Sequence, residues 1–96
     1  MATIKQQIAS VKQKLGQDVI CLFSGKRFYE AYCEDAKIVS EYCINTIKNN
    51  RTSEGVVLDV AAFNIKDLDI NLPKLVRAGY RVAICDMPVA QGRKTK

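Results

Sequence analysis

The sequence contains no histidine, and this absence removes several kinds of chemistry. Metal sites built on imidazole and serine nucleophiles activated by a histidine base are both excluded. A phosphate-binding P-loop is also missing, because Gly25-Lys26 has neither the upstream glycine nor the following serine or threonine. We therefore predict a non-enzymatic protein with no catalytic residues, no metal and no cofactor.

Long apolar runs are also absent. The aliphatic residues come in short clusters, and none approaches the roughly 18 consecutive apolar residues that a membrane span needs. The first seven residues, Met1 to Gln7, lack the apolar core of a secretion signal. These observations predict a cytoplasmic protein with no membrane partner, which is nucleoid-associated if it binds DNA.

The cysteines do not follow a metal-binding pattern. None of the four belongs to a C-x-x-C pair, so a zinc site would need four thiolates at irregular spacings. An even number leaves disulfides open. In a cytosolic chain we expect instead buried thiols that pack as small hydrophobic groups. The residues concerned are Cys21, Cys33, Cys43 and Cys85.

The formal net charge is +5, which suits a polyanionic partner without identifying one. Some of the acidic residues raise the alternative of a magnesium-dependent nuclease. Their spacing fits no acid-x-lysine nuclease core on one strand, and Asp67 and Asp69 resemble turn and helix-entry residues. The nuclease therefore remains a third hypothesis. Its candidate metal ligands are Asp59, Asp67, Asp69 and Asp86.

A chain of 96 residues is expected to form one domain. We assign residues 1–90 to a single domain and residues 91–96 to a basic disordered tail. Thr3 and Gln6 form a capping box that predicts a helix ending at Gly16. Its apolar stripe comprises Ile4, Ile8, Val11 and Leu15, and its solvated face carries Lys5, Lys12 and Lys14.

The next segments predict two strands and a helix. Residues 18–23 form a continuous apolar run, typical of a strand buried on both faces. Residues 24–27 break this run, and residues 28–32 place aromatics at alternating positions of a second strand. Glu34 and Asp35 supply negative charge at the start of a helix. The apolar stripe of this helix comprises Ala36, Val39, Tyr42 and Cys43.

The C-terminal half predicts two further strands, a helix and a last strand. Residues 44–50 include a short strand, residues 49–55 form the strongest turn signal, and residues 56–60 form a strand. Asn71 is the expected N-cap of a helix with Pro73 in its first turn. Leu72, Leu75 and Val76 are expected to face the core, and residues 80–85 form the last strand. The fold class is α/β (α+β), a mixed β-sheet flanked by about three helices.

Two segments resemble the N-terminal mismatch-recognition domain of the MutS family of DNA mismatch repair proteins. Residues 19–40, VICLFSGKRFYEAYCEDAKIVS, are similar to a strand, a phenylalanine-x-glutamate motif and an acidic helix start. Residues 72–86, LPKLVRAGYRVAICD, are similar to the closing helix, glycine turn and final strand. Because no connector, clamp or ATPase segment follows in the sequence, we expect a free-standing copy of this domain.

The resemblance implies the fold of that domain and a preference for mismatched or distorted duplex DNA. It implies that Phe28 is an aromatic wedge and that Glu30 contacts the displaced base. Repair proteins are candidate further partners. The residues expected to meet phosphates are Lys26, Arg27, Arg93, Lys94 and Lys96.

The sequence departs from the family pattern at several places. Lys26-Arg27 precede Phe28 where the family usually has glycine-aspartate. Residues 60–64 replace the usual glycine-proline-tyrosine-histidine loop before the closing helix. An extended residue 28–30 segment would place Phe28 and Glu30 on one face and Tyr29 in the core. The alternatives are that Phe28 is a core aromatic, and that the domain is a protein-interaction or regulatory module that does not bind DNA.

Overall fold

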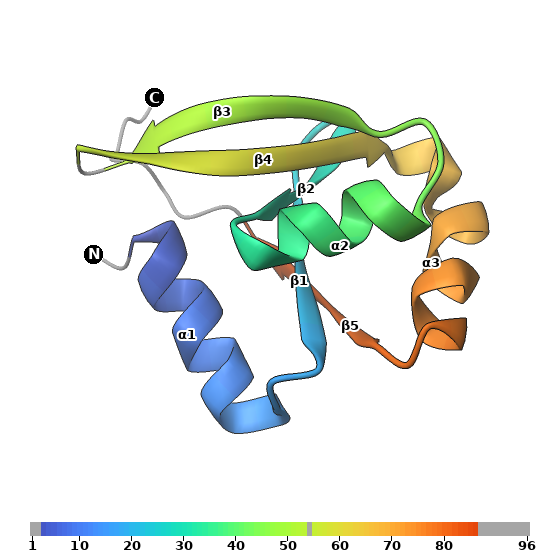
Figure 1. The fold of residues 1–96 in the computed structure, drawn as a ribbon, viewed down its shortest axis with the longest axis horizontal. Helices are drawn as coiled ribbons and strands as arrows, with labels where there is room; N and C mark the ends of the chain where they lie inside the picture. Colours follow the sequence, from blue (N-terminus) through green and yellow to red (C-terminus); the bar gives the residue numbers. More distant parts are fainter. Residues whose placement is uncertain (1–2, 54, 87–96) are drawn as a thin grey trace.

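A computed structural model describes residues 3–53 and 55–86 of the chain (Figure 1). The helices and strands follow the predicted order, with one additional short 3-10 helix, η1. In chain order they are α1 (Ile4–Leu15), β1 (Val19–Ser24), β2 (Phe28–Tyr32), α2 (Glu34–Tyr42), β3 (Ile47–Ser53), β4 (Val56–Asn64), η1 (Ile65–Asp67), α3 (Leu68–Arg77) and β5 (Arg81–Asp86).

The strands form one five-stranded sheet in the order β3-β4-β2-β1-β5. The β1 and β5 strands are parallel, whereas the other neighbours are antiparallel, so the sheet is mixed. The predicted α+β class is therefore confirmed. No helix in the described part of the chain is long and apolar enough to cross a membrane.

Side chains from the two faces of the sheet form two core clusters. On one face, Ile20, Leu22 and Phe63 pack against residues of α2 and α3. On the other face, Phe23 and Tyr32 pack with residues of α1. Successive residues of β1 thus enter opposite clusters, which is the pattern expected of a strand buried on both faces. The prediction from the apolar run is confirmed, since residues 19–23 are all buried.

Helix α1 begins as its sequence predicts. The Thr3 hydroxyl accepts a hydrogen bond from the Gln6 amide at 3.1 Å, and the Gln6 side chain accepts one from the Thr3 amide at 2.9 Å. These reciprocal bonds satisfy two backbone donors that the first helical turn leaves unpaired. Gly16 follows the helix with a φ of 121°, a conformation that glycine adopts readily.

The first half of β1 lacks a strand partner on its β2 side, because β1 and β2 pair only at Phe23–Glu30 and Ser24–Tyr29. Side chains occupy that edge instead. The Lys12 ammonium donates to the Val19 carbonyl at 2.6 Å and to Asp35 at 2.9 Å, and Asp35 accepts from the Cys21 amide at 3.1 Å. The prediction that Lys12 lies on a solvated face is therefore wrong.

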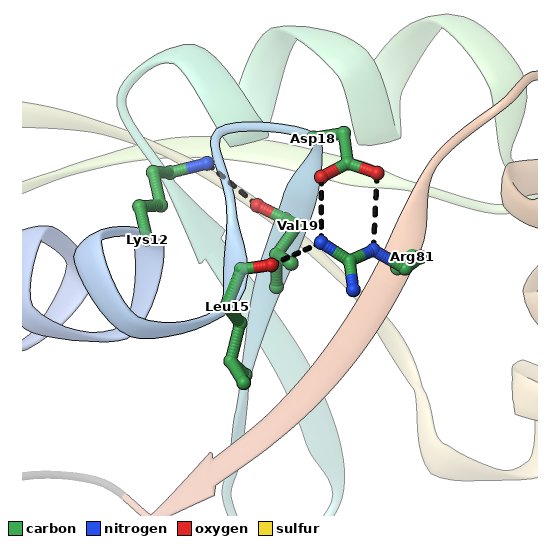
Figure 2. A network of polar contacts seen from close by, with 5 residues as sticks. All are labelled: Lys12, Leu15, Asp18, Val19 and Arg81. Carbon is green, nitrogen blue, oxygen red and sulfur yellow. Dashed lines mark hydrogen bonds and ion pairs between the residues drawn. The ribbon is translucent and has the colours of Figure 1, made fainter.

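A second polar network fixes the start of β5 against β1 (Figure 2). The Arg81 guanidinium donates two hydrogen bonds to Asp18, at 3.0 and 2.9 Å, and a further one to the Leu15 carbonyl. These hydrogen bonds hold the pKa of Asp18 below its usual value. The network joins the end of α1 to the first residues of both parallel strands.

The β3–β4 hairpin differs most from the prediction. Residues 49–53, expected in a turn or mobile loop, belong to β3, and β4 continues past the predicted strand 56–60 through residues 61–64, which were expected in a loop. The strand expected within residues 44–50 begins only at Ile47. Backbone pairing explains these errors, because β3 pairs with β4 from Ile47–Ala62 to Ser53–Val56. This continuous ladder overrides the turn propensity of the asparagines.

Helix α3 begins earlier than predicted. Its N-cap is Asp67, so Pro73 lies inside the helix and Asn71 is not a cap. The side chain of Asn71 is fully buried and bridges the two backbone groups of Ile44, accepting from its amide at 2.9 Å and donating to its carbonyl at 3.2 Å. The Asn71 side chain thus provides hydrogen-bond partners for the backbone of the α2–β3 loop, which lies far away in the sequence.

Some of the predicted apolar positions are also corrected. Leu15 and Tyr42 are predicted in apolar stripes and Val76 is predicted to face the core, but all three are exposed. The four cysteines are free thiols. Three are buried as predicted, whereas Cys33 is only half-buried because it lies at the N-cap of α2.

Candidate nucleic-acid interface

Phe28 is positioned by a turn that is hydrogen-bonded on both sides. The Gly25 amide donates to the Phe28 carbonyl at 2.9 Å, which closes the connection between β1 and β2. The Ile65 amide donates to the Arg27 carbonyl at 2.9 Å, and Phe28 pairs with Asn64. The first residue of β2 is therefore held against the end of β4.

The alternation along β2 separates its aromatic side chains. Tyr29 packs against the cluster that contains α2 and α3, with its ring 5.9 Å from that of Phe63. Tyr32 packs in the opposite cluster, and strand periodicity places Phe28 and Glu30 on the same face as Tyr32. Phe28 is half-buried and lies outside both clusters of described residues. The core-aromatic interpretation thus describes Tyr29 better than Phe28.

Glu30 is held by two neighbouring side chains. Its Oε1 atom accepts a hydrogen bond from the Tyr32 hydroxyl at 2.5 Å. Arg51 of β3 lies 3.5 Å from the same oxygen and donates to the Tyr32 hydroxyl oxygen at 2.8 Å. Burial, followed by the hydrogen bond to Glu30, raises the pKa of Tyr32 well above its usual range.

Sequence reasoning did not identify Arg51 or Tyr32 as site residues. Arg51 lies in the segment predicted as a turn, so no strand pairing was available to bring it to Glu30. Tyr32 appeared only as one of the alternating aromatics. The spacing of two residues between Glu30 and Tyr32 could have indicated Tyr32, because residues two apart in a strand share a face.

Exposed cations lie close to Phe28. Lys26 and Arg27 occupy the turn that precedes it, and Lys66 follows Ile65, whose amide bonds to Arg27. None of these cations forms an ion pair with another residue in 3–53 or 55–86. Lys66 is a further candidate that the sequence did not reveal. The predicted contacts Arg93, Lys94 and Lys96 lie outside the described residues.

The four aspartates considered as nuclease ligands do not gather into a metal-binding group in the described part of the chain. Within the described ranges, no group of three or more cysteine, aspartate or glutamate side chains could hold a metal ion. Asp67 is the N-cap of α3 and Asp69 lies in its first turn, as predicted for turn and helix-entry residues. The nuclease hypothesis therefore has no supporting site in this part of the chain.

A hollow of about 550 Å³ lies between α2 and the β3–β4 hairpin. Its charged lining is balanced, since Lys37 and Lys48 are accompanied by Glu41 and Asp59. Such a surface has no preference for a polyanion. The Phe28 surface, with unpaired cations beside it, is the stronger candidate for a nucleic-acid interface.

The fold and the site define a small α+β domain with a half-buried phenylalanine and glutamate on one face of β2, beside exposed cations. The sequence matches the MutS domain I family over residues 2–95. The chain belongs to this family.

Several relatives are much longer proteins that are named DNA mismatch repair protein MutS. The chain is 41% identical over 93 residues to the DNA mismatch repair protein MutS of Porphyromonas gingivalis, which covers 97% of this chain and 10% of that protein. It is 46% identical over 69 residues to the MutS of Phocaeicola vulgatus, covering 72% of this chain and 8% of that protein. The chain therefore spans about a tenth of the length of these relatives.

Proposed function

We propose that this chain binds DNA and prefers mismatched or distorted duplex, with Phe28 as the wedge and Glu30 as the base contact. The observation that carries the proposal is the position of both side chains. They share one face of β2, and Phe28 lies outside both core clusters and directly after the exposed cations Lys26 and Arg27. The relatives of the chain are named DNA mismatch repair proteins, which supports the same function.

The energetics of an aromatic wedge favour a defective duplex. Inserting a ring between bases costs a few kcal/mol of unstacking, and the cost is lowest where pairing is already poor. Stacking of a base on the ring returns about 1–3 kcal/mol. A wedge at Phe28 therefore gains most at a mismatch or an unpaired base. A carboxylate at Glu30 is repelled by phosphates, and a displaced base that offers a hydrogen-bond donor repays this cost at a mismatch but not in a homoduplex.

The cations around the wedge would supply the sequence-independent part of the binding. Lys26 and Arg27 are placed to meet phosphates beside the inserted ring, and Lys66 lies on the adjoining segment. Arg93, Lys94 and Lys96 are proposed as further phosphate contacts. A few such contacts typically give a non-specific Kd of about 10⁻⁴ to 10⁻⁶ M. In this proposal the domain acts in mismatch repair as a non-enzymatic recognition module, together with repair proteins.

The test is a titration of labelled homoduplex, mismatched duplex and bulged duplex at low salt. The expected result is tighter binding to the mismatched and bulged duplexes, with the preference lost in Phe28→Ala. Tyr42→Ala is the matched control, because Tyr42 is an exposed aromatic residue on α2. Equal binding to all duplexes by the wild-type protein, unchanged in Phe28→Ala, would contradict the proposal.

A further inference from the structure

We propose that Tyr32 and Arg51 determine the specificity of this site by holding the Glu30 carboxylate as a fixed acceptor for one class of base. This inference rests on the proposed function, since it concerns the partner of Glu30. Tyr32 and Arg51 act through Glu30, so they are positioning residues. The ligand class is a displaced base that presents an N–H donor.

Tyr32 and Arg51 both contact the Glu30 carboxylate. The Tyr32 hydroxyl lies 2.5 Å from Oε1 of Glu30, and Arg51 reaches both the hydroxyl oxygen, at 2.8 Å, and the same carboxylate oxygen, at 3.5 Å. Glu30 and Tyr32 lie on β2 and Arg51 lies on β3, with β4 between these two strands. Hydrogen bonds of this kind, with a charged acceptor, are about twice as strong as neutral ones.

Tyr32 is held in place by the core. Its side chain is only 1% exposed, and its ring packs edge-on against Phe23, with ring centres 5.4 Å apart and an interplanar angle of 77°. The hydroxyl that holds Glu30 therefore belongs to a ring fixed in the core. A recognition group supported in this way loses little conformational entropy on binding.

Arg51 also places a positive charge beside Glu30. Glu30 lies close to the surface that would meet phosphates, where an unpaired carboxylate would weaken binding to every duplex. The Arg51 guanidinium offsets that charge. With Oε1 engaged by Tyr32 and Arg51, Oε2 has no hydrogen bond to residues 3–53 or 55–86 and remains available as an acceptor. An acceptor selects a base edge that carries an N–H group.

The test compares the ratio of mismatched-duplex to homoduplex affinity in single variants. Tyr32→Phe keeps the ring and removes only the hydroxyl, so the ratio is expected to fall by roughly three- to tenfold, while thermal unfolding changes little. Tyr42→Phe, which removes a hydroxyl from an exposed tyrosine on α2, is expected to leave the ratio unchanged. A simple loss of folding would not move this ratio.

The arginine is tested in the same assay. Arg51→Ala is expected to lower the ratio and also to weaken homoduplex binding, whereas Arg51→Lys is expected to recover homoduplex binding because it retains the charge. Arg77→Ala, at an exposed position near the end of α3, is the matched control. An unchanged ratio in both Tyr32→Phe and Arg51→Ala would overturn the inference, while the wild-type preference would still support the proposed function. No preference in the wild type would remove the proposed function and this inference with it.

Discussion

The Lys12 ammonium lies 2.9 Å from Oδ1 of Asp35, beside the first half of β1, which does not pair with β2. The two side chains are 16% and 2% exposed. Together they bond to the Val19 carbonyl and the Cys21 amide, which strand β2 would otherwise have paired. This ion pair thus takes the place of a missing piece of backbone ladder and joins α1 to α2.

Removal of one member of this pair is expected to be costly. Lys12→Met leaves the buried Asp35 carboxylate unpaired, which typically costs about 3–5 kcal/mol of unfolding free energy. Urea denaturation measures the change, with Lys14→Met on the exposed side of α1 as the control. A loss no larger than that of the control would show that the pair does not support the fold.

Two phenylalanines should respond differently to truncation. Phe23 is fully buried, so Phe23→Ala is expected to cost about 3–5 kcal/mol of unfolding free energy. Phe28 lies outside both core clusters, and Phe28→Ala should cost about 1 kcal/mol. Parallel thermal or urea unfolding of the two variants checks this difference. Equal losses would mean that Phe28 is a structural residue.

The buried thiols predict a loss of stability at alkaline pH. Burial raises the pKa of Cys21 to about 12 and that of Cys43 to about 11, from an ordinary value of 9.0. The unfolded chain therefore releases these protons at a lower pH than the folded protein. Stability is complete below about pH 9 and falls as the pH rises toward these folded values, by up to about 1.4 kcal/mol per pH unit for each thiol.

Urea denaturation at neutral pH and at about pH 10 measures this effect. The Cys21→Ala/Cys43→Ala double variant should show a smaller decrease than the wild-type protein over the same interval. Subtracting the two removes the contribution of the other groups that titrate there. An identical decrease in both proteins would assign the alkaline loss to tyrosine or lysine instead.

The cations beside Phe28 should act on all duplexes alike. Lys26→Ala is expected to weaken binding to mismatched duplex and homoduplex by the same factor, and to reduce the slope of log affinity against log salt by about 1. Lys37→Ala is the control, because Lys37 lies on α2 and pairs with Glu34. A selective loss of mismatch binding in Lys26→Ala would instead indicate a base contact.

Local signals made much of the fold predictable. The capping box of Thr3 and Gln6 fixed the start of α1, and the alternation in residues 28–32 defined β2 with the observed bounds. The errors arose where distant partners decide the outcome. Asn49 and Asn50 are extended because β4 pairs with them, and Asn71 bridges Ile44 instead of capping its own helix.

The same distinction applies to the candidate site. Phe28 and Glu30 were recognised from a short motif, whose alternation follows from strand geometry alone. Arg51 lies 21 residues after Glu30 in the chain and contacts it from strand β3 of the β3–β4 hairpin. The sequence pattern predicts a turn at Arg51, so it does not indicate this contact. The contribution of Arg51 depends on tertiary contacts, so a motif confined to neighbouring residues could not reveal it.

The short connection between β1 and β2 also has a consequence for engineering. Side-chain parity along β2 is counted from the turn at residues 24–27, where the Gly25 amide bonds to Phe28. A single residue inserted into this turn could shift the register of β2 against β4 by one residue. Such a shift would exchange the two faces of β2, so that Phe28 would take the face now occupied by Tyr29, and Tyr29 the face now occupied by Phe28. Loop insertions of even length are therefore the safer route to grafting new sequence beside the motif, because they preserve which aromatic ring is presented.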